Sequence, residues 1–193
     1  MSHVCKALLY VPRAMEFRLV TLSFNSTLNL HVHNKRFKTQ TTPKPLAIIT
    51  ARCDTHVQAT VKCAKPKDIQ VRIRRGGHDF EGLSFVSDVN YVVLDMFPFL
   101  EVDLDIESGM AWVEAGATLG ELYYQIANRN NVHALPAGVC SSLGTGGHFS
   151  GGGYGKLMRK YAVSVDNIID AKLVNANGVI QDRKSMGRIC FGP

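Results

Sequence analysis

The stretch RIRRGGHDFEGLSFVSDVNYVVLDM, residues 72–96, decides the fold expected for this chain of 193 residues. A strand predicted over 69–73 runs into the pair Gly76 and Gly77. Two glycines after a strand let the backbone approach a ligand closely, and their N–H groups can surround a phosphate. The histidine that follows, His78, would then lie at the edge of the ligand. The alternative is a tight turn with a surface histidine, and the segment taken alone favours that alternative.

Further strands and helices are predicted on both sides of this stretch. Strands are predicted over 46–51, 69–73, 91–96, 102–107, 110–114, 168–174 and 179–182. One helix is capped by Asp54 and has Val57, Val61 and Ala64 on its inner face. Another helix begins at a capping box over 118–121. Strands alternate with helices early in the chain and hairpins come later, so the expected class is α+β.

The composition is that of a globular protein with one domain, at 46% apolar and 20% charged residues. The formal net charge of +6 favours acidic partners in principle. The longest basic cluster, however, is Arg72, Arg74 and Arg75, and binding of a cofactor phosphate explains it as well as nucleic acid does. No run of about 18 apolar residues occurs. We therefore expect neither a nucleic acid partner nor a membrane-spanning segment.

The segment 144–155 is extremely rich in glycine. Its seven glycines are Gly144, Gly146, Gly147, Gly151, Gly152, Gly153 and Gly155. We expect a loop that lines a ligand and not an ordinary linker. The dinucleotide motif G-x-G-x-x-G fails because Phe149 stands where the third glycine is required, and the P-loop motif fails because Leu157 follows Lys156.

A cysteine, Cys140, lies just before the glycines, at the end of the sequence PAGVC. A cysteine beside a bare backbone with oriented N–H groups can be held as a thiolate and is then reactive. A buried and inert thiol is the commoner alternative for a lone cysteine. His78, Cys140 and His148 show no paired local spacing, so no metal site is expected.

Three long stretches of the chain carry a resemblance to a known family. They are the stretch over 72–96 quoted above, AWVEAGATLGELYYQIA over 111–127, and PAGVCSSLGTGGHFSGGGYGKLMRKYAVSVDNIIDA over 136–171. Together they resemble the FAD-binding domain of berberine bridge enzyme-like proteins, a plant branch of the vanillyl-alcohol-oxidase-type flavoproteins. The resemblance implies a PCMH-type FAD-binding domain of two α/β subdomains over 41–193, after an irregular N-terminal leader over 1–40.

The resemblance also implies how FAD is attached. In that family the histidine of the G-G-H-D motif bonds the flavin 8α-methyl carbon, and the cysteine of P-A-G-V-C bonds flavin C6, so His78 and Cys140 would tether FAD twice. The segment 74–79 would surround the pyrophosphate through its backbone, with Arg75 where the family usually has serine. His148 would lie near the N1–C2 edge of the flavin, where a donor stabilises the anionic reduced form. The residues expected to contact FAD are His78, Cys140, Arg74, Arg75, Gly76, Gly77, Asp79, Gly138, Leu143, Gly144, Gly146, Gly147, His148, Gly152, Gly153, Tyr154, Asp166 and Ile168.

The family reaction is hydride transfer from a substrate carbon to the flavin, with a base that removes a proton. Leu143 stands where the family typically has a small residue, valine, that admits dioxygen, so leucine favours a dehydrogenase over an oxidase. Family members oxidise alkaloid precursors, sugars and aromatic alcohols, so a small-molecule substrate is expected. The family continues beyond DRKSMG, residues 182–187, with a substrate domain and the base, and here the ending RICFGP differs. An inactive flavin-binding fragment without that domain is therefore the alternative.

Three further expectations follow from the resemblance. Cys63 matches a disulfide cysteine of the family, and Cys5 is its candidate partner. The family is usually secreted or vacuolar, which implies secretion to the cell wall or a vacuolar location, and the sequon at Asn25 fits glycosylation. Residues 4–22 nevertheless show no clear signal peptide.

Overall fold

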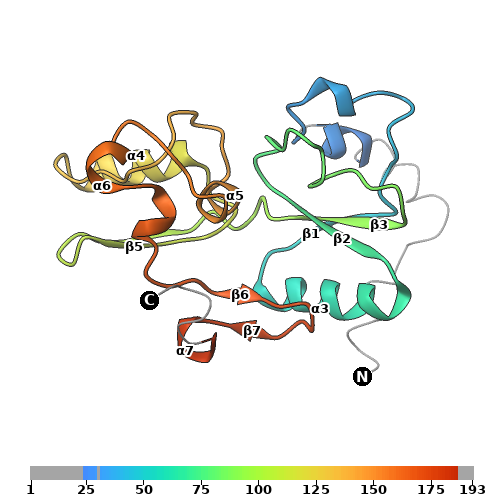
Figure 1. The fold of residues 1–193 in the computed structure, drawn as a ribbon. Coiled ribbons are helices and arrows are strands. Elements are labelled where there is room, and N and C mark those ends of the chain that lie inside the picture. The colour runs from blue at the N-terminus through green and yellow to red at the C-terminus, as the bar shows by residue number, and fades with distance from the viewer. Residues whose placement is uncertain (1–23, 30, 187–193) are drawn as a thin grey trace. The chain divides into compact units, whose positions relative to one another are not determined.

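The computed structural model describes residues 24–29 and 31–186 (Figure 1). These residues form two compact units. Unit 1 contains the described residues up to Met96 together with the later segment Leu173–Gln181. Unit 2 contains Phe97–Lys172 and the described residues from Asp182 onward. Unit 1 therefore includes a piece of chain from near the C-terminal end.

A parallel sheet of three strands is the centre of unit 1. Its strands are β1 (Ile48–Thr50), β2 (Gln70–Arg74) and β3 (Tyr91–Asp95), in the order β1-β3-β2. Every residue of β3 is buried, as expected for an apolar strand with a neighbour on each side. The helix α3 (Asp54–Ala64) makes the crossover from β1 to β2 and runs along one face of the sheet (Figure 1).

Helix α3 differs from the sequence prediction in its cap and its inner face. Its N-cap is Cys53, which makes no side-chain cap hydrogen bond, so the predicted cap at Asp54 is wrong. Val57 and Val61 are only half-buried. The buried residues of α3 are Thr60, Cys63 and Ala64. The helix is thus rotated relative to the predicted face, because the buried face is set by the sheet that it packs against.

A late hairpin completes unit 1. Its strands β6 (Leu173–Val174) and β7 (Ile180–Gln181) are antiparallel, as predicted, but both are shorter than expected. The hairpin lies beside α3 (Figure 1), where the amide of Gln58 donates to the carbonyl of Gly178 at 2.9 Å. These two residues are 120 positions apart in the sequence, so the contact belongs to tertiary structure alone.

The segment before β1 is part of unit 1. Residues 24–29 are helical, η1 (Lys35–Phe37) is a 3-10 turn, and Val32 between them is buried at 3% exposure. The described part of the expected leader over 1–40 is therefore packed into unit 1. Asn25 is exposed, and its glycosylation stays a prediction. Cys63 is buried, whereas its candidate partner Cys5 lies outside the described residues.

Unit 2 begins with the predicted hairpin and the predicted capped helix. Strands β4 (Val102–Asp105) and β5 (Met110–Val113) are antiparallel. Helix α4 (Leu119–Arg129) starts at a complete capping box. The Thr118 N–H donates to the Glu121 carboxylate at 2.7 Å, and the Glu121 N–H donates to the Thr118 hydroxyl at 3.3 Å. Both predictions are confirmed.

The glycine-rich segment is not wholly a loop, as had been expected, because α5 (Thr145–Ser150) lies within it. Thr145 anchors the start of this helix: it is buried at 1% exposure, and its N–H and hydroxyl both donate to the Ala117 carbonyl at 2.9 Å. Tertiary contacts therefore override the low helix propensity of glycine here. The remaining short elements are η2 (Lys65–Lys67), α6 (Met158–Tyr161), η3 (Ser164–Asn167) and α7 (Arg183–Met186). None of the helices in the described parts of the chain has the length and apolar character to cross a membrane.

Candidate functional site

The His78 loop follows directly on β2 and is held by the backbone of residues 31–33. Gly77 has a φ of +66°, a conformation that favours glycine. A Cβ atom on Gly77 would overlap the carbonyl oxygen of His31. The Gly77 carbonyl in turn accepts a hydrogen bond from the His33 N–H at 3.0 Å. The glycine before His78 is therefore needed for close approach of another part of the chain.

The side chains of this loop make specific contacts within unit 1. The rings of His33 and His78 are stacked, with centroids 4.2 Å apart and planes at 21°. The carboxylate of Asp79 accepts hydrogen bonds from the Ser84 N–H and hydroxyl, at 2.7 and 2.9 Å, and from the Glu81 N–H at 3.0 Å. Asp79 thus stabilises the loop itself, and contact between this residue and a cofactor stays a prediction.

A buried ion pair lies beneath the His78 loop. The Arg74 guanidinium is fully buried and donates to the Asp95 carboxylate at 2.6 Å. It also donates to the carbonyls of Leu28 at 2.8 Å and Thr27 at 3.2 Å. The same oxygen of Asp95 lies 3.2 Å from Nδ1 of His31. The Arg74 side chain is thus buried and hydrogen-bonded inside unit 1. Only the backbone of Arg74 is therefore expected to contact the pyrophosphate.

Cys140 of unit 2 is an exposed free thiol. The pKa of this thiol is lowered, first by the hydrogen bond of its sulfur with the Ser142 hydroxyl at 3.5 Å. The backbone N–H groups of Ser142 and Leu143 lower the pKa further. A lowered pKa increases the thiolate fraction, and the thiolate is the nucleophilic form of cysteine. The sulfur is therefore both accessible and chemically suited to form a covalent bond.

His148 lies on α5 and is oriented by the backbone of Gly138. Its Nε2 accepts a hydrogen bond from the Gly138 N–H at 3.0 Å. The neutral ring therefore carries its proton on Nδ1, which makes Nδ1 the donor. Burial lowers the pKa of His148, so the neutral form is favoured. The Tyr123 hydroxyl donates to the Gly138 carbonyl at 2.6 Å, so both the N–H and the carbonyl of Gly138 are hydrogen-bonded to side chains.

Four glycines of the segment 144–155 fall into two groups. At Gly153 a Cβ atom would lie 2.5 Å from the Ser164 hydroxyl oxygen, and at Gly155 it would overlap the Ala137 carbonyl. These positions need glycine for packing. At Gly147 and Gly152 no heavy atom lies within 4 Å of an added Cβ. These two positions therefore border open space, as expected of a backbone that approaches a ligand.

The other residues expected to contact FAD have varied surroundings. Gly144 is the N-cap of α5, and a Cβ atom on Gly146 would lie 3.0 Å from that of Ala115. Tyr154 is 75% exposed. The Asp166 carboxylate accepts a hydrogen bond from the Val163 N–H at 3.1 Å. The remaining residues expected at FAD, Arg75, Gly76, Leu143 and Ile168, are half-buried.

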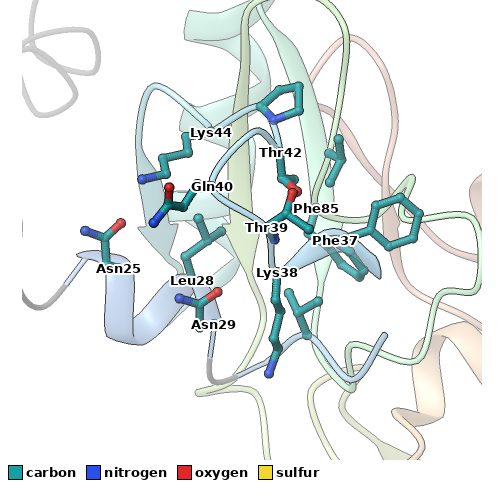
Figure 2. A pocket seen from close by; sticks show the side chains of 13 residues that line it. Asn25, Leu28, Asn29, Phe37, Lys38, Thr39, Gln40, Thr42, Lys44 and Phe85 are labelled. Carbon is teal, nitrogen blue, oxygen red and sulfur yellow. Dashed lines mark hydrogen bonds between the residues drawn. The ribbon is translucent and has the colours of Figure 1, made fainter. Parts of the chain in front are cut away.

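Each unit has one pocket of note. The pocket of unit 1 holds about 190 Å³ and contains none of the residues expected at FAD. Its labelled side chains come from the helical residues 24–29, from residues 37–44 and from Phe85 (Figure 2). The pocket of unit 2 holds about 630 Å³ and is lined by residues of α4, of the segments 130–135 and 137–139, and by Lys156 and Leu157. Only Gly138 of the expected site lies in its lining.

Sequence reasoning missed several residues that hold the site. They are His31, His33, Asp95, Tyr123 and Ser164. Only Asp95 gave a signal in the sequence. It is an acidic residue at the end of an apolar strand, and the preceding predicted strand is followed by the basic residue Arg74. His31 and His33 fall in a segment without periodicity, and their contacts with the His78 loop cannot be read from sequence.

His78 directly follows Gly77, and Cys140 stands two residues after Gly138. Gly147 and Gly152 leave room beside the backbone. Within residues 24–29 and 31–186, no group of three or more His, Cys, Asp or Glu side chains is arranged to hold a metal ion.

Comparison with known proteins supports the expected FAD-binding domain. The FAD binding domain family matches residues 45–183. Among curated relatives from Arabidopsis thaliana, berberine bridge enzyme-like 14 is 54% identical over 170 residues, which cover 88% of this chain and 32% of the relative. Tetrahydroberberine oxidase from Berberis wilsoniae is 53% identical, with coverage of 89% and 32%.

Solved structures show the same fold. Berberine bridge enzyme from Eschscholzia californica matches with a TM-score of 0.83 at 43% identity, over 85% of this chain and 33% of that chain. Wild-type Phl p 4.0202, a glucose dehydrogenase, matches with a TM-score of 0.84 at 44% identity, over 86% and 34%. The chain spans about a third of the length of these relatives. The expected fold is confirmed, and the chain belongs to the berberine bridge enzyme-like family of FAD-binding proteins.

Proposed function

We propose that this chain carries FAD for an oxidoreductase and attaches it by two covalent bonds, one to His78 and one to Cys140. Cys140 supports the proposal most directly, because it is an exposed thiol of the FAD-binding domain two residues after Gly138, whose N–H orients His148. A structural cysteine would be buried and inert. His78 supports it as well, since its ring is presented by a glycine loop at the end of β2.

When bound, FAD accepts a hydride from a carbon atom of the substrate. The residues of this chain would bind FAD and orient it. The backbone of the segment 74–79 binds the pyrophosphate, His78 and Cys140 tether the ring system, and the Nδ1–H of His148 donates to developing negative charge. The proposed substrate is a small molecule of the alkaloid, sugar or aromatic alcohol class. Among the relatives, one is named for tetrahydroberberine and another is described as a glucose dehydrogenase.

Covalent attachment predicts that acid denaturation of the purified chain leaves FAD bound to protein. We expect peptide mapping by mass spectrometry to find flavin on the His78 and Cys140 peptides. In His78→Ala the flavin should remain attached through Cys140 only, and in the double variant His78→Ala with Cys140→Ala no covalent flavin should remain. Cys53→Ala is the matched control, because Cys53 is also an exposed thiol with a lowered pKa.

Two outcomes of this experiment would count against the proposal. Persistence of both links in His78→Ala would show that the attachment sites are wrong. A soluble and folded chain without covalent flavin would show that these residues do not suffice for attachment. Bound flavin without turnover of any substrate would instead mean that the chain holds the cofactor but does not catalyse.

We further propose that Leu143 restricts access of dioxygen to the flavin, so that the protein behaves as a dehydrogenase. Related structures support the principle: wild-type Phl p 4.0202 is described as a glucose dehydrogenase, and a Phl p 4 variant with valine in place of isoleucine as a glucose oxidase. Leu143→Val should therefore speed reoxidation of the reduced flavin by dioxygen by roughly tenfold. Stopped-flow absorbance measures this rate, and Leu83→Val, at an exposed leucine of unit 1, is the control. Equal rates in wild type and Leu143→Val would exclude this role.

A further inference from the structure

Residues 31–33 contact the His78 loop at three places. The His31 carbonyl lies against Gly77, the His33 N–H donates to the Gly77 carbonyl at 3.0 Å, and the His33 ring stacks on the His78 ring. All three contacts join segments that are more than 40 residues apart in sequence. We propose that His33 is a positioning residue that holds the His78 ring for attachment to the flavin. This inference rests on the proposed function.

Ring stacking is the contact that orients the nucleophile. A histidine on a loop can rotate about two side-chain bonds, and most of its rotamers would point its nitrogens away from any one acceptor. A second ring at a centroid distance of 4.2 Å and an angle of 21° covers one face of His78 and restricts that rotation. The side chain of His33 is itself exposed, so burial in the core does not explain its place.

The buried ion pair anchors the positioning segment. His31 contacts the Asp95 carboxylate at 3.2 Å, and Asp95 is bound to Arg74 at the end of β2. Arg74 also binds the Leu28 carbonyl at 2.8 Å, just before the same segment. The backbone that carries His33 is therefore fixed to the strand that carries the His78 loop. A stacked ring on such a support can hold its partner in one orientation, as attachment of a nucleophile requires.

His33 would assist the formation of one covalent bond between His78 and the flavin. The N–H bond of His78 and one C–H bond of the flavin 8α-methyl group break, and a C–N bond forms. The two protons and two electrons that are released pass to the flavin ring system. Dioxygen then reoxidises the flavin and is reduced to hydrogen peroxide. Formation of the C–N bond depends on the His78 nitrogen lying in line with the methyl carbon, which is the geometry that the stack controls.

The inference predicts a selective defect in the variant His33→Ala. Attachment at His78 should be roughly tenfold slower, because a stacking contact is lost and the nucleophile is less well placed. Attachment at Cys140 should be unchanged, since Cys140 belongs to unit 2. His33→Phe keeps an aromatic ring and should restore most of the rate at His78. Lys35→Ala removes a neighbouring exposed side chain and should have no effect.

The test measures the two bonds separately in the full chain. Protein purified from riboflavin-starved cells is mixed with FAD in air, quenched in acid at intervals and digested, and flavin on the His78 and Cys140 peptides is quantified by mass spectrometry. NMR of the histidine ring protons provides a second readout that needs no flavin: the ring-current shift of His78 should disappear in His33→Ala and persist in His33→Phe.

The outcomes separate the inference from the proposed function. If the wild-type chain shows flavin at neither residue, the proposed function fails and the inference with it. If the wild-type chain is flavinylated and His33→Ala reacts at His78 at the same rate, only the inference fails. An equal loss at both residues would indicate general destabilisation and would also overturn the positioning role.

Discussion

Replacing Asp95 by alanine is expected to lower the free energy of unfolding by about 3–5 kcal/mol, because it leaves the buried Arg74 guanidinium without its counter-charge. The Asp95 carboxylate is 2% exposed and binds both Arg74 and His31. Its loss would also release the segment that supports the His78 loop. Urea unfolding followed by circular dichroism measures the change.

The control for this prediction is Asp88→Ala, which removes an exposed carboxylate from the same unit and should change stability little. A double variant tests the cause. If the cost arises from an unpaired charge, Asp95→Leu combined with Arg74→Met should be less destabilising than the sum of the two single changes. Additive losses would mean that the two side chains stabilise the fold independently, against the role assigned to the pair.

Substitution of Gly77 by alanine is expected to destabilise the chain by about 2–5 kcal/mol and to prevent attachment of flavin at His78. The positive φ of +66° strains any side chain at this position. In addition, the new Cβ atom would overlap the His31 carbonyl, so the segment 31–33 would have to move away. Thermal unfolding and mapping of flavin on the His78 peptide measure the two effects.

Gly109→Ala separates the two causes of this loss. Gly109 also has a positive φ, of +69°, but no heavy atom lies within 4 Å of an added Cβ. Its substitution should therefore lower the free energy of unfolding only by the backbone strain, about 1–2 kcal/mol. If Gly77→Ala costs no more than Gly109→Ala, the close approach of His31 is not what requires glycine before His78.

Local patterns in the sequence predicted much of the fold correctly. The hairpin of β4 and β5 and the Thr118–Glu121 capping box of α4 depend on interactions between near neighbours in the chain. Such interactions do not depend on the rest of the fold, so a short window of sequence is enough to recognise them. The motifs around His78 and Cys140 were sufficient for the same reason to indicate the family, since they are long and contiguous.

The predictions for other elements were wrong or incomplete where contacts between distant residues decide the local structure. Helix α5 forms in a glycine-rich segment because Thr145 is anchored on Ala117. The buried face of α3 is set by the sheet, and the hairpin of β6 and β7 adds to unit 1 through a contact across 120 residues. Propensity and periodicity contain no information about such contacts.

The sequence by itself identified the proposed attachment residues, His78 and Cys140, and the glycines near them, because these are contiguous motifs. Tertiary structure alone decided how each is held. It pairs His33 with His78, buries Arg74 against Asp95, and turns Nε2 of His148 toward Gly138. Each of these contacts joins residues that the chain must fold to bring together, and their geometry depends on the packing of whole elements.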